Sequence, residues 1–77
     1  MNDYHKATLD KKKTGFLIRN AIIDSGMTIE QISMNLEFAS SRVIYEWMNG
    51  IKLPSLESLA NLALMLNKKM EDFIALR

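Results

Sequence analysis

Five polar side chains lie on one face of the segment from residue 41 to residue 49 if that segment is a helix: Ser41, Arg42, Tyr45, Glu46 and Asn49. Ile44 and Trp47 are three residues apart, so both point to the opposite side, toward a core. The outward set combines hydrogen-bond donors and acceptors with one positive and one negative charge. These side chains are suited to recognising another polar surface.

Catalytic chemistry has no comparable support in this sequence. The single histidine, His5, has no nucleophile to partner, and no cysteine is present to form a disulfide or a thiolate metal site. Gly15, Gly26 and Gly50 are isolated and punctuate helices, so they form no phosphate-binding loop. We therefore expect no enzyme, no metal, no cofactor and no small-molecule substrate.

Length and composition indicate one small globular domain. The chain has 77 residues, of which 48% are hydrophobic and 25% charged, which is too apolar for disorder. The N-terminus lacks the apolar stretch of a signal peptide, and the most apolar stretch, residues 59–66, is too short to cross a bilayer. The expectation is a soluble cytoplasmic protein.

The charges are unevenly distributed. The net charge is +1, with Lys6, Lys11, Lys12 and Lys13 gathered near the N-terminus. Residues 14–50 carry two positive charges against four negative ones. A domain that binds nucleic acid is commonly more basic, so this balance gives that class of partner little support.

Helix-start and helix-stop signals predict five short helices. Residues 1–13 are polar and are expected to form a flexible arm, after which residues 14–77 form the domain. Thr14 is expected to cap the first helix, whose apolar stripe contains Phe16, Leu17, Ala21 and Ile22, with Ile18 beside it; Gly26 ends it.

The remaining helices follow similar signals. Thr28 and Gln31 form a capping box for a helix with Ile29, Ile32, Ser33 and Leu36 on one face. Ser40 or Ser41 can cap a third helix that runs through Asn49 and ends at Gly50, and Ser55 caps a fourth at residues 56–66. A last short helix spans residues 70–76. No segment alternates with the period of a strand, so the fold class is all-α.

The second and third helices are joined by a short turn, which is the geometry of a helix-turn-helix motif. The sequence resembles the Cro/repressor-type helix-turn-helix family, also called the XRE family, from about residue 13 to residue 76. Three blocks carry the resemblance: Met27-Thr28-Ile29-Glu30-Gln31-Ile32-Ser33, Val43-Ile44-Tyr45-Glu46-Trp47-Met48-Asn49-Gly50 and Leu53-Pro54-Ser55-Leu56-Glu57-Ser58-Leu59. It implies a compact five-helix bundle of the lambda-repressor-like type and a sequence-specific, repressor-like regulator that binds a double-stranded DNA operator.

The resemblance also implies roles for individual residues. Ser41, Arg42 and Glu46 would read base edges, because a guanidinium fits guanine O6 and N7 and a carboxylate can accept from cytosine N4. Side chains expected along the DNA backbone are those of Thr28, Ser40, Tyr45, Asn49 and Lys52, together with the Lys11, Lys12 and Lys13 run. For several of them a structural or solvated role is the alternative: Tyr45 could pack over the helix, and the lysines could belong to a solvated tail.

Three positions depart from the family pattern. The turn between Leu36 and Ile44 is one residue longer than the commonest spacing. Ile22 and Met48 stand where many relatives have an Arg–Glu ion pair, and packed apolar groups can replace such a pair without loss of stability. Ile29 replaces a glutamine that touches phosphate in relatives, which removes one expected contact.

Such domains commonly bind pseudo-palindromic sites as dimers. No further segment follows the last helices in this sequence, so a homodimer is expected to pair through the C-terminal helices, where Met65, Phe73, Ile74 and Leu76 supply an apolar patch. The alternative is a protein-interaction module on the same fold, such as an antitoxin or a domain that has lost DNA binding. The acidic middle of the chain and the apolar Val43 and Met48 favour that alternative.

Overall fold

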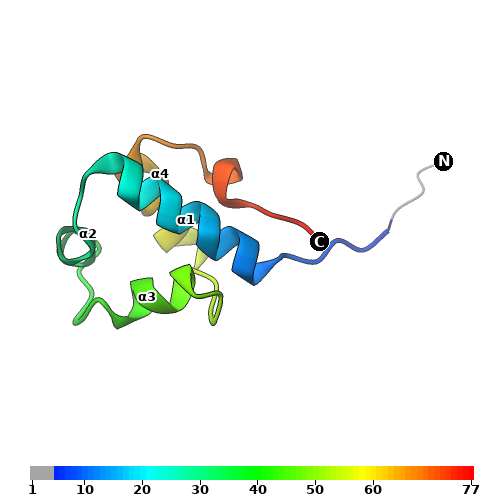
Figure 1. Cartoon of the computed structure of the whole chain (residues 1–77), viewed down its shortest axis with the longest axis horizontal. Coiled ribbons are helices and arrows are strands. Elements are labelled where there is room, and N and C mark those ends of the chain that lie inside the picture. The colour runs from blue at the N-terminus through cyan, green and yellow to red at the C-terminus, as the bar shows by residue number, and fades with distance from the viewer. Residues whose placement is uncertain (1–4) are drawn as a thin grey trace.

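The computed structural model describes residues 5–77 and contains four α-helices and one 3-10 helix within them (Figure 1). They are α1 (Lys11–Ser25), α2 (Ile29–Asn35), α3 (Arg42–Met48), α4 (Leu56–Leu66) and η1 (Met70–Phe73). The predicted all-α class is confirmed, but the predicted number of α-helices is wrong. The last one is a 3-10 turn, in which the Lys69 N–H donates to the Asp72 carboxylate at 2.9 Å and the chain becomes extended at Ile74.

Helix α1 begins four residues earlier than the predicted cap at Thr14 implies. Asp10 is its N-cap, since its carboxylate accepts a hydrogen bond from the Lys13 N–H at 3.0 Å. The predicted cap, Thr14, is instead buried inside the helix. Residues 11–13, assigned to the arm, thus form the first turn of α1; Met1–Tyr4 of that arm lie outside the described residues.

Helices α2 and α4 begin where their capping signals predict. Thr28 Oγ1 accepts from the Gln31 N–H at 3.1 Å, and Gln31 Oε1 accepts from the Thr28 N–H at 2.9 Å, so the capping box is complete. Ser55 Oγ accepts from the Ser58 N–H at 3.1 Å at the start of α4. Gly26 and Gly50 follow α1 and α3 with positive φ angles of 75° and 70°, a conformation that disfavours side chains other than glycine.

The core forms around α1, which contacts α3, α4 and η1. Its largest fully buried side chains are Phe73, Ile18, Ile32, Ile44 and Leu62. The predicted stripe on α1 is wrong in one respect: Phe16 is 58% exposed, whereas Ile18 is fully buried. The large aromatic lies on the outside because α1 turns Thr14 and Gly15 inward at that level.

At Gly15 the backbone of α1 lies close to the backbone at the end of α3. A Cβ atom added to Gly15 would lie against the carbonyl oxygen of Trp47 and 2.8 Å from that of Met48. The interpretation of this glycine as a helix boundary is therefore wrong, because it lies within α1. Gly15 is required because no side chain fits between the two helices.

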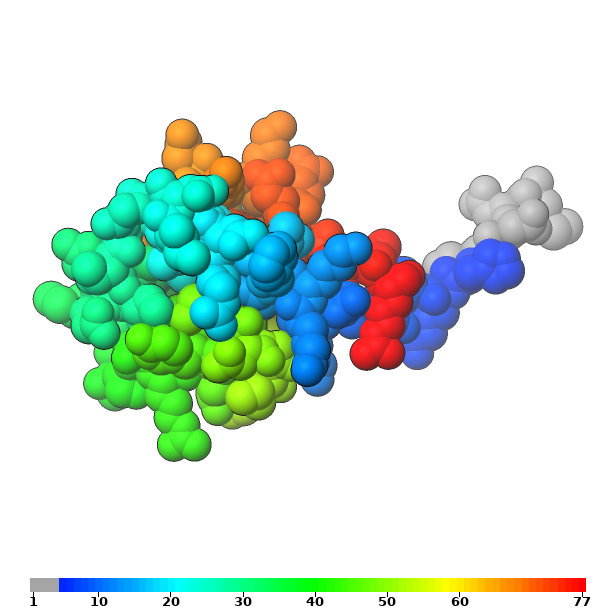
Figure 2. Space-filling view, viewed as in Figure 1, coloured from blue at the N-terminus to red at the C-terminus, as the bar shows by residue number. Residues whose placement is uncertain are grey.

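The two ends of the described chain are hydrogen-bonded to each other. The Asp10 N–H donates to the Ala75 carbonyl at 2.8 Å, and the Arg77 N–H donates to the Thr8 carbonyl at 2.9 Å, on either side of an antiparallel bridge between Leu9 and Leu76. Figure 2 shows these C-terminal residues, in red, against the blue N-terminal segment. Residues 8–10 are therefore part of the folded domain.

The turn between α2 and α3 contains six residues, Leu36 to Ser41. Glu37 adopts a left-handed conformation with a φ of 60°, and the Phe38 N–H donates to the Ser33 carbonyl at 3.0 Å. The Phe38 ring packs edge-on against Trp47 with centroids 5.6 Å apart. The turn is thereby fixed to both helices of the motif.

None of the helices within residues 5–77 is both long and apolar enough to pass through a membrane.

Candidate nucleic-acid interface

Helix α3 is amphipathic in the way its sequence predicts. Ile44, Trp47 and Met48 are buried, and α3 packs them toward α1 and the core. The Arg42 side chain is 84% exposed, and Tyr45 and Asn49 are exposed as well. In Figure 1, α3 lies along one edge of the molecule.

The start of α3 differs from a standard capped helix. Ser41 is the N-cap residue but makes no side-chain capping bond. Ser40 Oγ accepts from the Arg42 N–H at 3.4 Å, which is a long hydrogen bond. Of the two serines proposed as caps, Ser40 therefore contributes the one side-chain contact at this end of α3 within the described residues.

Glu46 lies between two positive charges. Its carboxylate is 3.9 Å from Arg42 Nε on one side and 3.9 Å from Lys52 Nζ on the other. The Glu46 side chain is 18% exposed, far less than either partner. Its backbone carbonyl also accepts from the Ile51 N–H at 2.9 Å, so Glu46 connects α3 to the loop that carries Lys52.

Arg19 joins the site from α1 and is absent from the sequence-based list. Its Nη2 donates to Asn49 Oδ1 at 3.1 Å, across 30 residues of sequence. Lys12 lies nearby, because a Cβ on Gly50 would be 2.8 Å from the Lys12 Cα. The i, i+7 spacing of Lys12 and Arg19 puts them on one face of a helix, but only the packing of α1 on α3 brings that face to Asn49 and Gly50.

Three of the residues expected to contact the DNA backbone, namely Thr28, Lys11 and Lys13, lie outside α3 and are not bonded to it through their side chains. Thr28 caps α2 with its side-chain oxygen, and its hydroxyl hydrogen is left to donate elsewhere. Lys11 and Lys13 are exposed in the first turn of α1. Between residues 5 and 77, no side-chain hydrogen bond or ion pair connects any of these three to α3.

Ile22 and Met48, which stand where the resemblance implies an ion pair, are both buried. Ile22 is 4% exposed and Met48 is 7% exposed, and both belong to one hydrophobic cluster. This agrees with the interpretation of a substitution compensated by packing. Ile29 packs against the same cluster and is half-buried, so it offers no polar contact to a phosphate.

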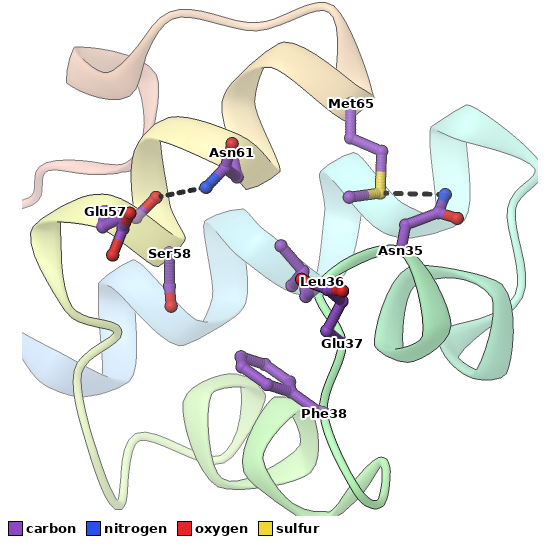
Figure 3. Close-up of a pocket in the computed structure, with 8 residues that line it drawn as sticks. All are labelled: Asn35, Leu36, Glu37, Phe38, Glu57, Ser58, Asn61 and Met65. Carbon is purple, nitrogen blue, oxygen red and sulfur yellow. Dashed lines mark hydrogen bonds between the residues drawn. The ribbon is translucent and has the colours of Figure 1, made fainter.

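A polar pocket of about 410 Å³ lies between the turn after α2 and helix α4 (Figure 3). Its lining includes Glu37, Glu57, Asn35 and Asn61, together with the apolar Leu36 and Phe38. Asn35 Nδ2 donates to Met65 Sδ at 3.7 Å, and Asn61 Nδ2 donates to the Glu57 carbonyl at 3.1 Å. Among the lining residues the charged side chains are those of Glu37 and Glu57, so the pocket is acidic.

No family model matches this sequence, and no curated protein matches it either. Solved structures do match its fold. The clp gene regulator ClgR from C. glutamicum is 23% identical, with a TM-score of 0.74 over 91% of this chain and 88% of that chain. The restriction-modification controller protein C.AhdI from Aeromonas hydrophila is 19% identical, with a TM-score of 0.74 over 83% of this chain and 96% of that one.

The DNA-binding domain of BldD is also similar, at 15% identity and a TM-score of 0.71 over 86% of this chain and 94% of that domain. These similarities confirm the Cro/repressor-type helix-turn-helix fold that the resemblance implies. The fold is thus shared with one DNA-binding domain and two regulatory proteins. Helices α2 and α3 are the two helices that the sequence predicts as the helix-turn-helix pair.

Proposed function

We propose that this chain is a sequence-specific DNA-binding transcriptional regulator of the repressor type, acting in the cytoplasm, and that it inserts α3 into the major groove of an operator. The observation that carries the proposal is the exposed polar face of α3, with Arg42 extended into solvent and positive charges beside it. A major groove admits one α-helix, and arginine is the side chain that most often reads guanine there. The related fold of three DNA-binding or regulatory proteins supports the same function.

Roles divide according to the geometry around α3. Arg42 and Ser41 lie early on the helix and read base edges in this proposal. Lys52, Asn49, Ser40, Tyr45 and Thr28 contact the DNA backbone, together with the Lys11, Lys12 and Lys13 run. Arg19 is added to the backbone group, because its guanidinium already lies beside Asn49. The Glu46 carboxylate can accept a hydrogen bond from a cytosine amino group only if it moves away from Arg42 and Lys52.

A homodimer would let two copies read a pseudo-palindrome with half-sites one helical turn apart. The patch expected for this pairing needs correction, because Phe73 is 1% exposed and belongs to the core. Ile74 and Leu76 are exposed, and Met65 is half-buried at the polar pocket.

The proposal is tested by selecting randomised duplex DNA with the purified protein and measuring fluorescence anisotropy on the enriched sequence over a salt series. We expect a pseudo-palindrome to be enriched. The logarithm of the association constant should fall linearly with the logarithm of the salt concentration. Each phosphate contact should contribute about −0.9 to the slope. Failure to enrich any sequence at low salt, with a folded protein, would rule out operator binding.

A protein-interaction module on the same fold is the second candidate. The acidic pocket in Figure 3 favours it, because a pocket that includes Glu37 and Glu57 would repel DNA and could accept a basic side chain of a protein. This alternative would be established by two results together. No duplex sequence is enriched, and a protein partner binds with defined stoichiometry and no longer binds the Glu37→Lys variant.

A further inference from the structure

Two polar side chains connect helix α1 to the exposed end of helix α3. Arg19 Nη2 donates a hydrogen bond to Asn49 Oδ1 at 3.1 Å. Asn49 is the C-cap residue of α3, and Arg19 is exposed on α1, one turn beyond Gly15. Both side chains belong to the group that is proposed above to lie along the DNA backbone. One member of that group therefore touches, and orients, another.

The chemistry of the two groups fixes which way the Asn49 amide faces. A guanidinium has donors and no acceptor, so only the oxygen of the amide can face Arg19. The amide nitrogen, with its two N–H donors, then faces away from the guanidinium. Between residues 5 and 77, no acceptor is hydrogen-bonded to Asn49 Nδ2. Those donors are left for an acceptor outside the chain.

The backbones that carry the two side chains are also held in contact. At Gly15, the α1 backbone lies against the carbonyl groups at the end of α3, and a Cβ on Gly50 would be 2.8 Å from the Lys12 Cα. Arg19 therefore projects from a helix whose distance to Asn49 is fixed by packing. Because the guanidinium fork is planar and rigid, it loses little freedom for each hydrogen bond that it forms. The bond can thus hold the amide in one orientation.

We propose that Arg19 is a positioning residue for DNA binding, which holds the Asn49 amide so that its nitrogen donates to a phosphate oxygen. Phosphate oxygens in DNA act as acceptors, so an amide turned the other way would present its own oxygen to them and form no bond. This inference rests on the proposed function and deepens it. There Arg19 contacts the DNA backbone itself, whereas here it also acts through Asn49.

The first test uses the free chain and needs no DNA. Relaxation of ¹⁵N in the Asn49 side-chain NH₂ group measures how ordered the amide is. Arg19→Ala should lower its order parameter. Lys12→Ala removes the same charge from the same face of α1 and should leave the order parameter unchanged. Arg19→Lys can still donate to the Asn49 oxygen and should restore part of the order. An amide that is equally mobile with and without Arg19 would overturn the inference.

The second test is a double-mutant cycle on the enriched duplex, read by fluorescence anisotropy. Arg19→Ala should weaken binding about fivefold more when Asn49 is present than in the Asn49→Ala background, because only then is an oriented donor lost as well. Lys12→Ala should weaken binding by the same factor in both backgrounds. If the effect of Arg19→Ala is also the same in both, Arg19 acts through its own contact alone and the inference is wrong.

A third test separates the donor of the amide from its acceptor. Asn49→Asp keeps an oxygen for Arg19 but replaces the N–H donors with a second oxygen. We expect this variant to fold and to bind the duplex about tenfold more weakly than Asn49→Ala. Asn20→Asp, at an exposed position of α1, is the control for net charge and should cost much less. Equal losses for Asn49→Asp and Asn20→Asp would contradict a donor at Asn49.

Failure of the inference and failure of the proposed function give different results. If the proposed function is wrong, no duplex is enriched, even though the order of the Asn49 amide still depends on Arg19. If only the inference is wrong, a duplex is enriched and the effects of Arg19→Ala and Asn49→Ala on its binding are additive.

Discussion

At the scale of single residues, Glu46 is the one negatively charged side chain of α3. Its carboxylate is held 3.9 Å from the side chains of both Arg42 and Lys52. A negative charge in this place opposes phosphate, and it offsets two cations that would otherwise bind any DNA sequence. We therefore expect Glu46 to oppose non-specific binding of DNA.

Replacing this carboxylate should make the protein less selective. We expect Glu46→Gln to raise the affinity for random-sequence duplex DNA severalfold and to steepen the salt dependence by about 0.9 for each new phosphate contact. Fluorescence anisotropy at several salt concentrations measures both quantities.

Glu71→Gln is the control for net charge, since Glu71 is exposed in η1, away from α3. If the two variants gain the same affinity for random DNA, Glu46 has no specific restraining role. If Glu46→Gln instead loses affinity for the operator alone, Glu46 is a base contact.

At the scale of helices, the contact between α1 and α3 determines how the candidate interface is presented. Gly15 allows the α1 backbone to lie against the carbonyl groups of Trp47 and Met48. This contact orients α3 so that its apolar side is covered and Arg42 remains exposed.

Gly15→Ala should lower the free energy of unfolding by at least about 2 kcal/mol, because the new Cβ has no space between the two backbones. Helix propensity alone would make alanine about 1 kcal/mol better than glycine, so the expected sign is opposite to the propensity effect. Urea unfolding measures the difference. Asn20→Ala, at an exposed position of α1, should be neutral or stabilising. A Gly15→Ala variant as stable as the unchanged protein would show that α1 and α3 can separate without cost.

Helix boundaries show how far the sequence determines the structure. Thr28 and Ser55 mark helix starts correctly, because a capping side chain acts within three residues of itself. The sequence places the start of α1 too late. The three lysines that follow Asp10 show no apolar residues at helical spacing, so they resemble a solvated tail. The exposed face of α3 follows from periodicity. The contacts of Glu46 with Lys52 and of Arg19 with Asn49 depend on how the chain folds back, and local sequence carries no signal for them.

At the scale of the whole molecule, the N-terminal residues 8–10 and the C-terminal residues 75–77 are hydrogen-bonded to each other. Thr14 Oγ1, in a side chain buried within α1, accepts a hydrogen bond from the Ala75 N–H at 3.3 Å. This bond holds the C-terminal segment beside residues 8–10, with which it pairs. A small domain has a narrow margin of stability, so a single buried bond of this kind matters.

Thr14→Val keeps the shape of the side chain but leaves the Ala75 N–H without its acceptor. We expect a loss of about 1–3 kcal/mol in the free energy of unfolding. In a domain of this size, the melting temperature should fall by roughly 4–8 °C for each kcal/mol lost. Thr8→Val, at an exposed position, is the control and should change little. Equal melting temperatures for both variants would mean that the Thr14 hydroxyl does not hold the C-terminus.

The central claim is that Arg42 reads a base through the major groove. The most direct measurement is a double-mutant cycle between Arg42→Ala and an operator in which 7-deazaguanine, which lacks N7, replaces one guanine at a time. At the guanine that Arg42 contacts, the base change should weaken binding of the unchanged protein by about 1–3 kcal/mol and have little further effect on the Arg42→Ala variant. If the two changes are additive at every guanine of the enriched site, Arg42 does not read guanine N7 and its assignment as the base-reading arginine is contradicted.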